Sequence, residues 1–259
     1  MPRPFEVYDA LIELVPPERT ADDVLVGPYR TLVRSGGDIG VAITAKDGGI
    51  DIPDAGSLAG RPLRELAERV RSWNLAEASV GLAAINAALN TKENAERLTG
   101  RPLSALPAES IFDVMRECLR GQKVAVVGHF PGLERLGEVA TLTVLERKPL
   151  PGELPDSAAE VVLPDQDVVF LTAATLVNKT FSRLAELSRN ALVVLVGPST
   201  PLAPMLFDYG VDVLAGAVVT EAAHVWRVVQ EGGHYRRFHE GVQRVTVMSA
   251  RSRPEGTCG

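Results

Sequence analysis

The chain has 259 residues, of which 46% are hydrophobic and 23% are charged, and this composition is typical of a globular protein with one large or two small domains. The formal net charge is −6 at pH 7 and no lysine- and arginine-rich run occurs, so the attraction that drives nucleic-acid binding is missing. No stretch approaches the roughly 20 apolar residues that cross a bilayer, and the N-terminus lacks the pattern of a signal peptide. We expect a cytoplasmic protein that binds a small molecule and neither nucleic acid nor a membrane.

The N-terminal region predicts a helix followed by a small antiparallel sheet. Residues 4–14 have a helical pattern. Residues 23–34 and 39–45 are rich in Val, Ile and Thr, and the Gly36-Gly37 pair between them supplies the positive-φ turn of a hairpin.

Two helices follow the hairpin. Residues 62–73 place apolar side chains three and four positions apart, and residues 75–89 are Ala-rich and nearly free of charge, which is typical of a buried helix. A polar span over 90–107 then separates this region of hairpin and helices from a region of short apolar runs. We predict an α+β domain over 1–105 and a second domain over 106–259.

The second domain contains short apolar runs separated by helical or loop segments. Continuous apolar strands are buried on both faces, as in a parallel sheet covered by helices. The pattern predicts a Rossmann-like α/β fold, whose ligands bind outside the carboxyl ends of the strands. The predicted strands are residues 123–127, 140–145, 167–172, 191–196 and 211–214.

The loops after the first two predicted strands carry candidate ligand-binding groups. Gly128 opens a turn with a second glycine at Gly132, which could bring backbone amides close to an anion, although the G-x-G-x-x-G fingerprint is absent. His129 is the one histidine of four on a predicted strand-end loop, and we assign it as the candidate acid or base. Glu146 lies 18 residues after Gly128, near the offset of a ribose-binding acid, and the alternative is a solvated glutamate.

The loop after the third strand is the richest in hydrogen-bonding side chains. Thr172, Thr175, Asn178 and Thr180 follow one another before the next helix. Local capping explains one or two of them, and we expect the others to bind a ligand.

The remaining loops combine small residues with hydroxyls. Gly197, Pro198, Ser199 and Thr200 form a rigid turn that could hydrogen-bond a carboxylate or phosphate, or serve as a helix cap. Gly216 follows the last predicted strand and permits close approach of a ligand or of another backbone.

Five strings together resemble a known prokaryotic family: GLAAINAALN at 81–90, VVGHFPGL at 126–133, PDSAAEVVLPDQDVVFLTAATLVNKT at 155–180, VVLVGPSTPLAP at 193–204 and YGVDVLAG at 209–216. The resemblance is to the putative heavy-metal chelation family, a domain of unknown function. It implies an enolase N-terminal-like domain before the Rossmann-like one. The family's motif positions fall on Asn86, Asn90, Gly128, His129, Thr172, Thr175, Asn178, Thr180, Gly197, Pro198, Ser199, Thr200 and Gly216.

Asn86 and Asn90 lie one helical turn apart in an otherwise apolar helix. Buried amides need hydrogen-bond partners, so these two side chains either face the cleft between the domains or cap local backbone. The sequence leaves both alternatives open.

Three functions agree with these patterns. The first is a binding protein, with or without catalysis, for an anionic, nucleotide-like or metal-containing small molecule between the domains. The second is an enzyme that uses a nucleotide-type cofactor such as S-adenosylmethionine or NAD, and the third is an assembly protein. We expect His129, Thr175, Asn178 and Ser199 to converge on one cavity between the domains. A bound transition metal and a homodimer both stay open.

Overall fold

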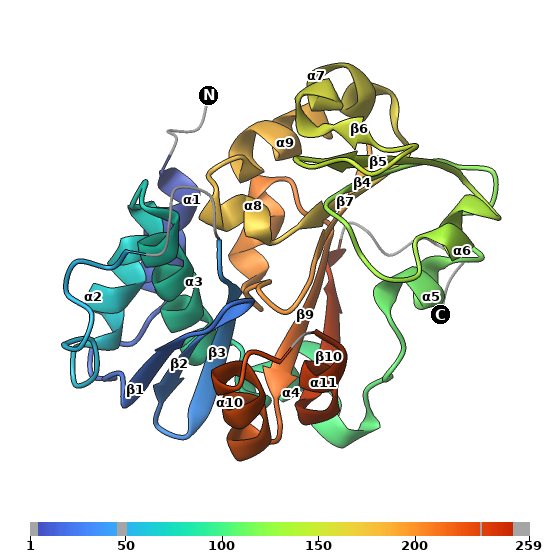
Figure 1. Ribbon diagram of the computed structural model, residues 1–259. Helices are drawn as coiled ribbons and strands as arrows, with labels where there is room; N and C mark the ends of the chain where they lie inside the picture. Colours follow the sequence, from blue (N-terminus) through green and yellow to red (C-terminus); the bar gives the residue numbers. More distant parts are fainter. Residues whose placement is uncertain (1–4, 46–50, 234, 251–259) are drawn as a thin grey trace.

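The computed structural model describes residues 5–45, 51–233 and 235–250, which form a small and a large β-sheet with helices packed on both (Figure 1). The small sheet has the strand order β1-β2-β3, and the large one has the order β10-β9-β8-β7-β4-β5-β6. The predicted α/β class is therefore confirmed, with a small antiparallel sheet preceding a mainly parallel one.

The small sheet contains the predicted hairpin. Strands β2 (Arg30–Ser35) and β3 (Asp38–Ile43) pair antiparallel, and Gly36 and Gly37 connect them with φ values of 58° and 92°. Two consecutive positive φ angles match the twist of a hairpin, which explains the two glycines. The first predicted strand is in fact two strands, because a turn separates β2 from β1 (Asp23–Val26).

Helix α3 packs on this sheet and confirms the predicted buried helix over 75–89, while α2 packs against α3 and α4 contacts the large sheet. A Cβ on Gly40 of β3 would lie 2.0 Å from both Ala83 O and Ala87 N of α3, so only glycine permits this backbone contact. The helices are α1 (Glu6–Glu13), α2 (Leu63–Glu68), α3 (Leu75–Leu89) and α4 (Lys92–Thr99).

The large sheet is parallel except for the pair β9 and β10. The first four predicted strands are present, but the predicted strand over 211–214 corresponds to a longer β9, and Gly216 lies inside β9 and not after it. The strands are β4 (Lys123–Val127), β5 (Thr141–Glu146), β6 (Leu154–Pro155), β7 (Val168–Thr172), β8 (Leu192–Val196), β9 (Val213–Val219) and β10 (Val242–Met248).

Helices lie on both faces of the large sheet (Figure 1). Successive residues of each central strand point to opposite faces of the sheet, so both faces are apolar and need cover. Val126 and Phe170 belong to one core cluster, while Ala125 and Leu171 belong to another. The remaining helices are α5 (Ile111–Met115), α6 (Glu134–Gly137), α7 (Ala159–Val162), α8 (Ala174–Val177), α9 (Phe181–Leu187), α10 (Ala222–Gln230) and α11 (Tyr235–Phe238). Of these, α10 packs against β1 and β2 of the small sheet.

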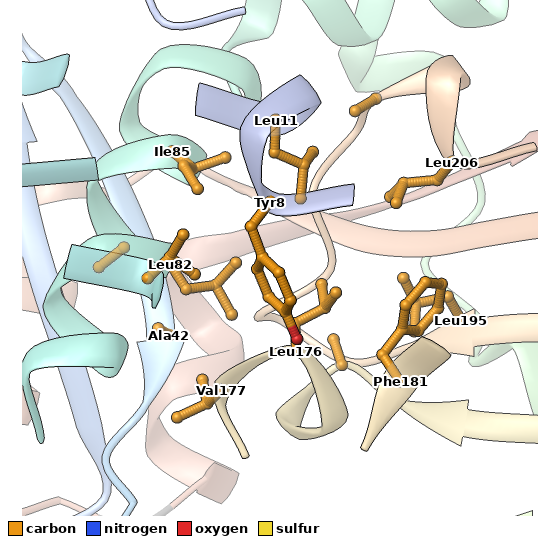
Figure 2. Packing of buried hydrophobic residues seen from close by; sticks show 14 of the residues in the cluster. Tyr8, Leu11, Ala42, Leu82, Ile85, Leu176, Val177, Phe181, Leu195 and Leu206 are labelled. Carbon is orange, nitrogen blue, oxygen red and sulfur yellow. The ribbon is translucent and has the colours of Figure 1, made fainter. Parts of the chain in front are cut away.

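One hydrophobic core extends from the small sheet into the large one. Figure 2 shows the ring of Tyr8, from α1, packed among Leu82 of α3 and Leu176 and Val177 of α8. The two sheets are therefore held together by shared apolar packing. Among the described residues, no helix is long and apolar enough to cross a membrane.

Candidate functional site

The strand order places a crevice at the carboxyl ends of β4 and β7. Chain connections leave β4 toward β5 on one side and reach β7 on the other, which is the topological switch point where open α/β sheets bind ligands. A cavity of about 330 Å³ lies here, lined on one side by Ile43 at the end of β3 and by the two residues that follow it. We call it the strand-end cavity. Six predicted residues line it: Gly128, Glu146, Thr172, Thr175, Asn178 and Thr180.

The turn after β4 lies directly against the β7 strand end. Gly128 has φ 106°, and a Cβ on it would lie 3.0 Å from the side chain of Thr172. Glycine therefore satisfies both the backbone conformation and the close approach. The backbone of this turn forms part of the cavity wall.

The polar side chains after β7 make more local hydrogen bonds than expected. Thr175 Oγ1 donates to Thr172 O at 2.7 Å, and Thr172 Oγ1 accepts from Ala174 N at 3.3 Å. Asn178 Oδ1 accepts from Thr180 N at 3.1 Å and from Thr180 Oγ1 at 2.6 Å. These bonds fix the loop conformation, so the Nδ2 donors of Asn178 and the hydroxyl proton of Thr172 are the groups left for a ligand.

Charged residues from the β5 end surround the mouth of the cavity. Glu146, Arg147, Lys148 and Asp156 all line it. Arg147 N donates to Glu146 Oε2 at 2.8 Å, and Arg147 Nε lies 3.5 Å from Asp156 Oδ2. Glu146 is a predicted site residue, whereas Arg147 and Lys148, which follow it directly at the strand end, were not predicted.

His129 lies outside the strand-end cavity and pairs with a carboxylate. Its Nδ1 is 2.7 Å from Glu153 Oε1, and its side chain is 51% exposed. Glu153 Oε2 accepts a hydrogen bond from Leu150 N, and this bond, together with the imidazole, lowers the pKa of the Glu153 carboxyl. A carboxylate on Nδ1 favours the tautomer that leaves the Nε2 lone pair free to accept a proton.

Lys179 is strained and partly desolvated beside the cavity. It is the one described non-glycine residue with positive φ, at 67°. Its Nζ donates to Val177 O at 2.7 Å and lies 5.6 Å from the centre of the Tyr8 ring. Burial lowers the pKa of Lys179 to about 8. Lys179 was not predicted as a site residue, because neither the backbone conformation nor the burial of a lysine is visible in a single sequence.

The two predicted asparagines are buried at the junction of the two sheets, where their side chains bind main chain of β3 and of the large sheet. Asn86 Nδ2 donates to Val41 O at 2.7 Å and to Ser199 O at 2.9 Å. Ser199 Oγ in turn accepts from Ile43 N at 2.8 Å. Both side chains are buried, so they connect α3, β3 and the turn after β8.

Asn90 forms the second half of this connection. Its Nδ2 donates to Thr200 O at 2.9 Å and to Ala217 O at 3.1 Å, and its Oδ1 accepts from Leu202 N at 2.9 Å. Asn90 and Thr200 are 4% and 0% exposed. The structure therefore divides the four residues expected to converge: Thr175 and Asn178 line the strand-end cavity, Ser199 is in this buried network, and His129 is in the exposed pair with Glu153.

Gly197, Pro198 and Gly216 line a different cavity, between β8, β9, β10 and α5. Gly216 is glycine for a packing reason, because a Cβ there would lie 2.9 Å from Thr200 O. None of the three is part of the strand-end cavity.

The described side chains do not form a metal site of their own. Across residues 5–45, 51–233 and 235–250, no group of three or more His, Cys, Asp or Glu side chains could hold an ion. Cys118 is half-buried and disulfide-bonded, so it is not a thiolate ligand.

Comparisons with known proteins agree with this architecture. Residues 110–248 match the DUF364 family model and residues 8–89 match the DUF4213 model, both described as "Putative heavy-metal chelation". An uncharacterized protein of Methanocaldococcus jannaschii is 28% identical over 172 residues, and the chain spans 61% of that protein's length.

Two solved structures cover nearly the whole chain. A DUF364 protein of unknown function from Desulfitobacterium hafniense is 37% identical, with a TM-score of 0.85 over 95% of this chain and 98% of that one. A DUF364 protein from Pyrococcus horikoshii has a TM-score of 0.77 at 22% identity, over 94% of this chain and 98% of that one, and supports the fold alone. With both family models matched in order and 37% identity along a solved member, this chain belongs to the DUF364 family of putative heavy-metal chelation proteins.

Proposed function

We propose that this protein binds a small organic molecule with nucleotide-like hydroxyl and anionic groups in the strand-end cavity. The observation that carries the proposal is the convergence of strand-end loops from β4, β5 and β7 on one cavity of about 330 Å³ at the switch point of the sheet. The predicted domain division at residue 105 then places the site between two domains.

The lining supplies complementary groups for such a ligand. The Glu146 carboxylate can accept hydrogen bonds from a diol, and Lys148 and Arg147 can attract an anionic group at the mouth. Leu75 and Leu184 provide apolar surface for a ring. A metal would enter as part of a bound complex, because the described residues offer no ligand cluster.

A thermal-shift panel with S-adenosylmethionine, NAD and ADP tests the proposal. A ligand whose concentration is one hundred times its dissociation constant stabilises the folded protein by about 2.7 kcal/mol. For a chain of this size, this raises Tm by about 5 to 10 °C. Isothermal titration then compares the wild-type protein with Glu146→Gln and Ala174→Leu, two changes in the cavity lining.

The matched controls are Glu134→Gln and Ala223→Leu, at exposed positions outside the cavity. We expect at least tenfold weaker binding in both cavity variants and unchanged binding in both controls. Equal binding in all four variants, or no shift with any panel member, would contradict the proposal.

A second candidate function is an enzyme that uses a nucleotide-type cofactor, and the His129–Glu153 pair supports it. His129 follows Gly128, which lines the cavity, and its Nδ1 contact with Glu153 orients the ring as in general bases. We expect the wild-type protein to convert a bound cofactor in the presence of a metabolite extract, measured by mass spectrometry. His129→Gln should keep cofactor binding and lose conversion, and equal conversion would exclude this role.

A further inference from the structure

A second cavity, of about 340 Å³, lies beside β8, β9 and β10, and it shares no lining residue with the strand-end cavity. The ring of Phe130 lies between the two. It approaches within 3.5 Å of a Cβ built on Gly128, which lines the strand-end cavity, and within 3.9 Å of one built on Gly197, which lines the second. The two cavities are therefore separate sites at the same edge of the sheet.

Small residues on the sheet create the second cavity. Gly197, Ala215 and Ala217 line it and carry at most a methyl group. Successive strand residues point to opposite faces, and Gly216 between the two alanines contacts Thr200 O on the other face. The alanines therefore face the cavity, where larger side chains would fill the space.

One wall of the cavity is aromatic. The rings of Phe112 and Phe130 have centroids 5.3 Å apart, and Phe112 packs in turn against Phe170 at 4.9 Å. Phe112 and Phe130 both line the cavity. Such a rigid apolar wall favours a planar ring over a flexible chain, because ring stacking adds to the burial of apolar area.

The other end of the cavity carries the guanidinium group of Arg244. Arg244 donates to Ala108 O and lies 3.4 Å from His239 Nε2. Burial lowers the pKa of His239, and the positive charges of Arg244 and Arg30 lower it further, to about 4. This imidazole is therefore neutral at pH 7. No described acidic side chain lies within ion-pair distance of Arg244, whereas the other lining arginine, Arg135, pairs with Asp113 at 2.9 Å.

We propose that the second cavity binds a planar aromatic carboxylate, with its ring against Phe112 and Phe130 and its carboxylate at Arg244. A half-buried guanidinium that already donates to a neutral imidazole and a carbonyl has donors left for an anion, and a carboxylate matches its planar geometry. This site is additional to the strand-end cavity and does not depend on what that cavity binds.

Ligand-observed NMR and isothermal titration with benzoate, nicotinate and indole-3-carboxylate test the assignment. The uncharged amides of the same three acids serve as chemical controls. We expect at least one acid to bind and its amide to bind about tenfold more weakly, because a charge-assisted hydrogen bond contributes at least that ratio.

Two variants probe opposite ends of the cavity. Arg244→Gln removes the cation and Ala217→Leu fills the floor, while Arg227→Gln and Ala223→Leu make the same changes at exposed positions of α10. Each cavity variant should bind the acid at least tenfold more weakly than its control variant does. Either variant suffices if the other fails to fold by circular dichroism.

Three results would overturn the proposal. The first is that none of the three acids binds at millimolar concentration. The second is that Arg244→Gln or Ala217→Leu, when folded, binds as tightly as its control. The third is that Glu146→Gln in the strand-end cavity removes acid binding while Arg244→Gln keeps it, which would place the acid in the other cavity.

Discussion

Replacing Asn90 with alanine tests whether the buried asparagines are structural. Asn90→Ala removes three hydrogen bonds, to Thr200 O, Ala217 O and Leu202 N, and leaves these main-chain groups buried without partners. A buried polar group left unsatisfied costs about 1 to 3 kcal/mol. For three such groups we expect a loss of about 3 to 9 kcal/mol, a large part of the 5 to 15 kcal/mol typical of a folded protein.

Urea unfolding followed by circular dichroism measures this loss, with Asn190→Ala as the matched control. Asn190 is exposed, and its substitution should change stability by less than about 0.5 kcal/mol. A ligand-binding role for Asn90 would instead leave the stability of the free protein unchanged and weaken binding. A change in Asn90→Ala as small as that in Asn190→Ala would refute the structural reasoning.

Further predictions concern backbone contact and titration. Gly40→Ala should prevent accumulation of folded protein, since its Cβ would meet Ala83 O at 2.0 Å, whereas Gly137→Ala, with its nearest contact at 3.8 Å, should fold normally by circular dichroism. A backbone amide and an imidazole lower the pKa of Glu153 in the folded state, so the ionised carboxylate stabilises the fold above the unfolded pKa of about 4.3. This contribution disappears as pH falls through the folded pKa. Glu153→Gln should therefore reduce the pH dependence of the free energy of unfolding in this acidic range. NMR should find that His239 titrates with a pKa of about 4, and a midpoint near 6.5 would contradict its desolvation.

The elements that the sequence predicted correctly are those with a local signal. The hairpin at Gly36 and Gly37 follows from adjacent residues that both need positive φ, and α3 follows from a continuous Ala-rich run. Strand β10 was missed because it lies at the sheet edge, where Thr246 and Met248 are exposed and alternate with buried residues, so it lacks the continuous apolar run of the central strands.

The strand-end rule identified the loops of the cavity but not the use of each side chain. Thr175 and Asn178 lie where the rule places a ligand, yet their oxygens are occupied by bonds within the loop. Asn90 and Ala217 are 127 positions apart, so no local pattern could show that one binds the other. Long-range hydrogen bonds decide which polar residues of a motif are structural.

Lys179 supplies the strongest physical sign that the loop beside the cavity has a function. A positive φ at a residue with a side chain costs about 1 kcal/mol or more, and a buried ammonium adds to that cost. Burial lowers the pKa of Lys179 from 10.5 to about 8, so the folded state disfavours the charged form. The contribution of Lys179 to stability is therefore most favourable above pH 10.5, and it falls with pH until it levels off below the folded pKa of about 8.

Lys179→Met removes the charge and keeps the side-chain length, so we expect it to raise Tm at pH 7 and to lose this advantage as pH approaches 10. Differential scanning calorimetry at the two pH values measures the effect. Lys179→Gly should also raise Tm at pH 7, because glycine adopts φ 67° without strain. A lower Tm in both variants at pH 7 would mean that Lys179 stabilises the fold, and the inference from strain to function would then be wrong.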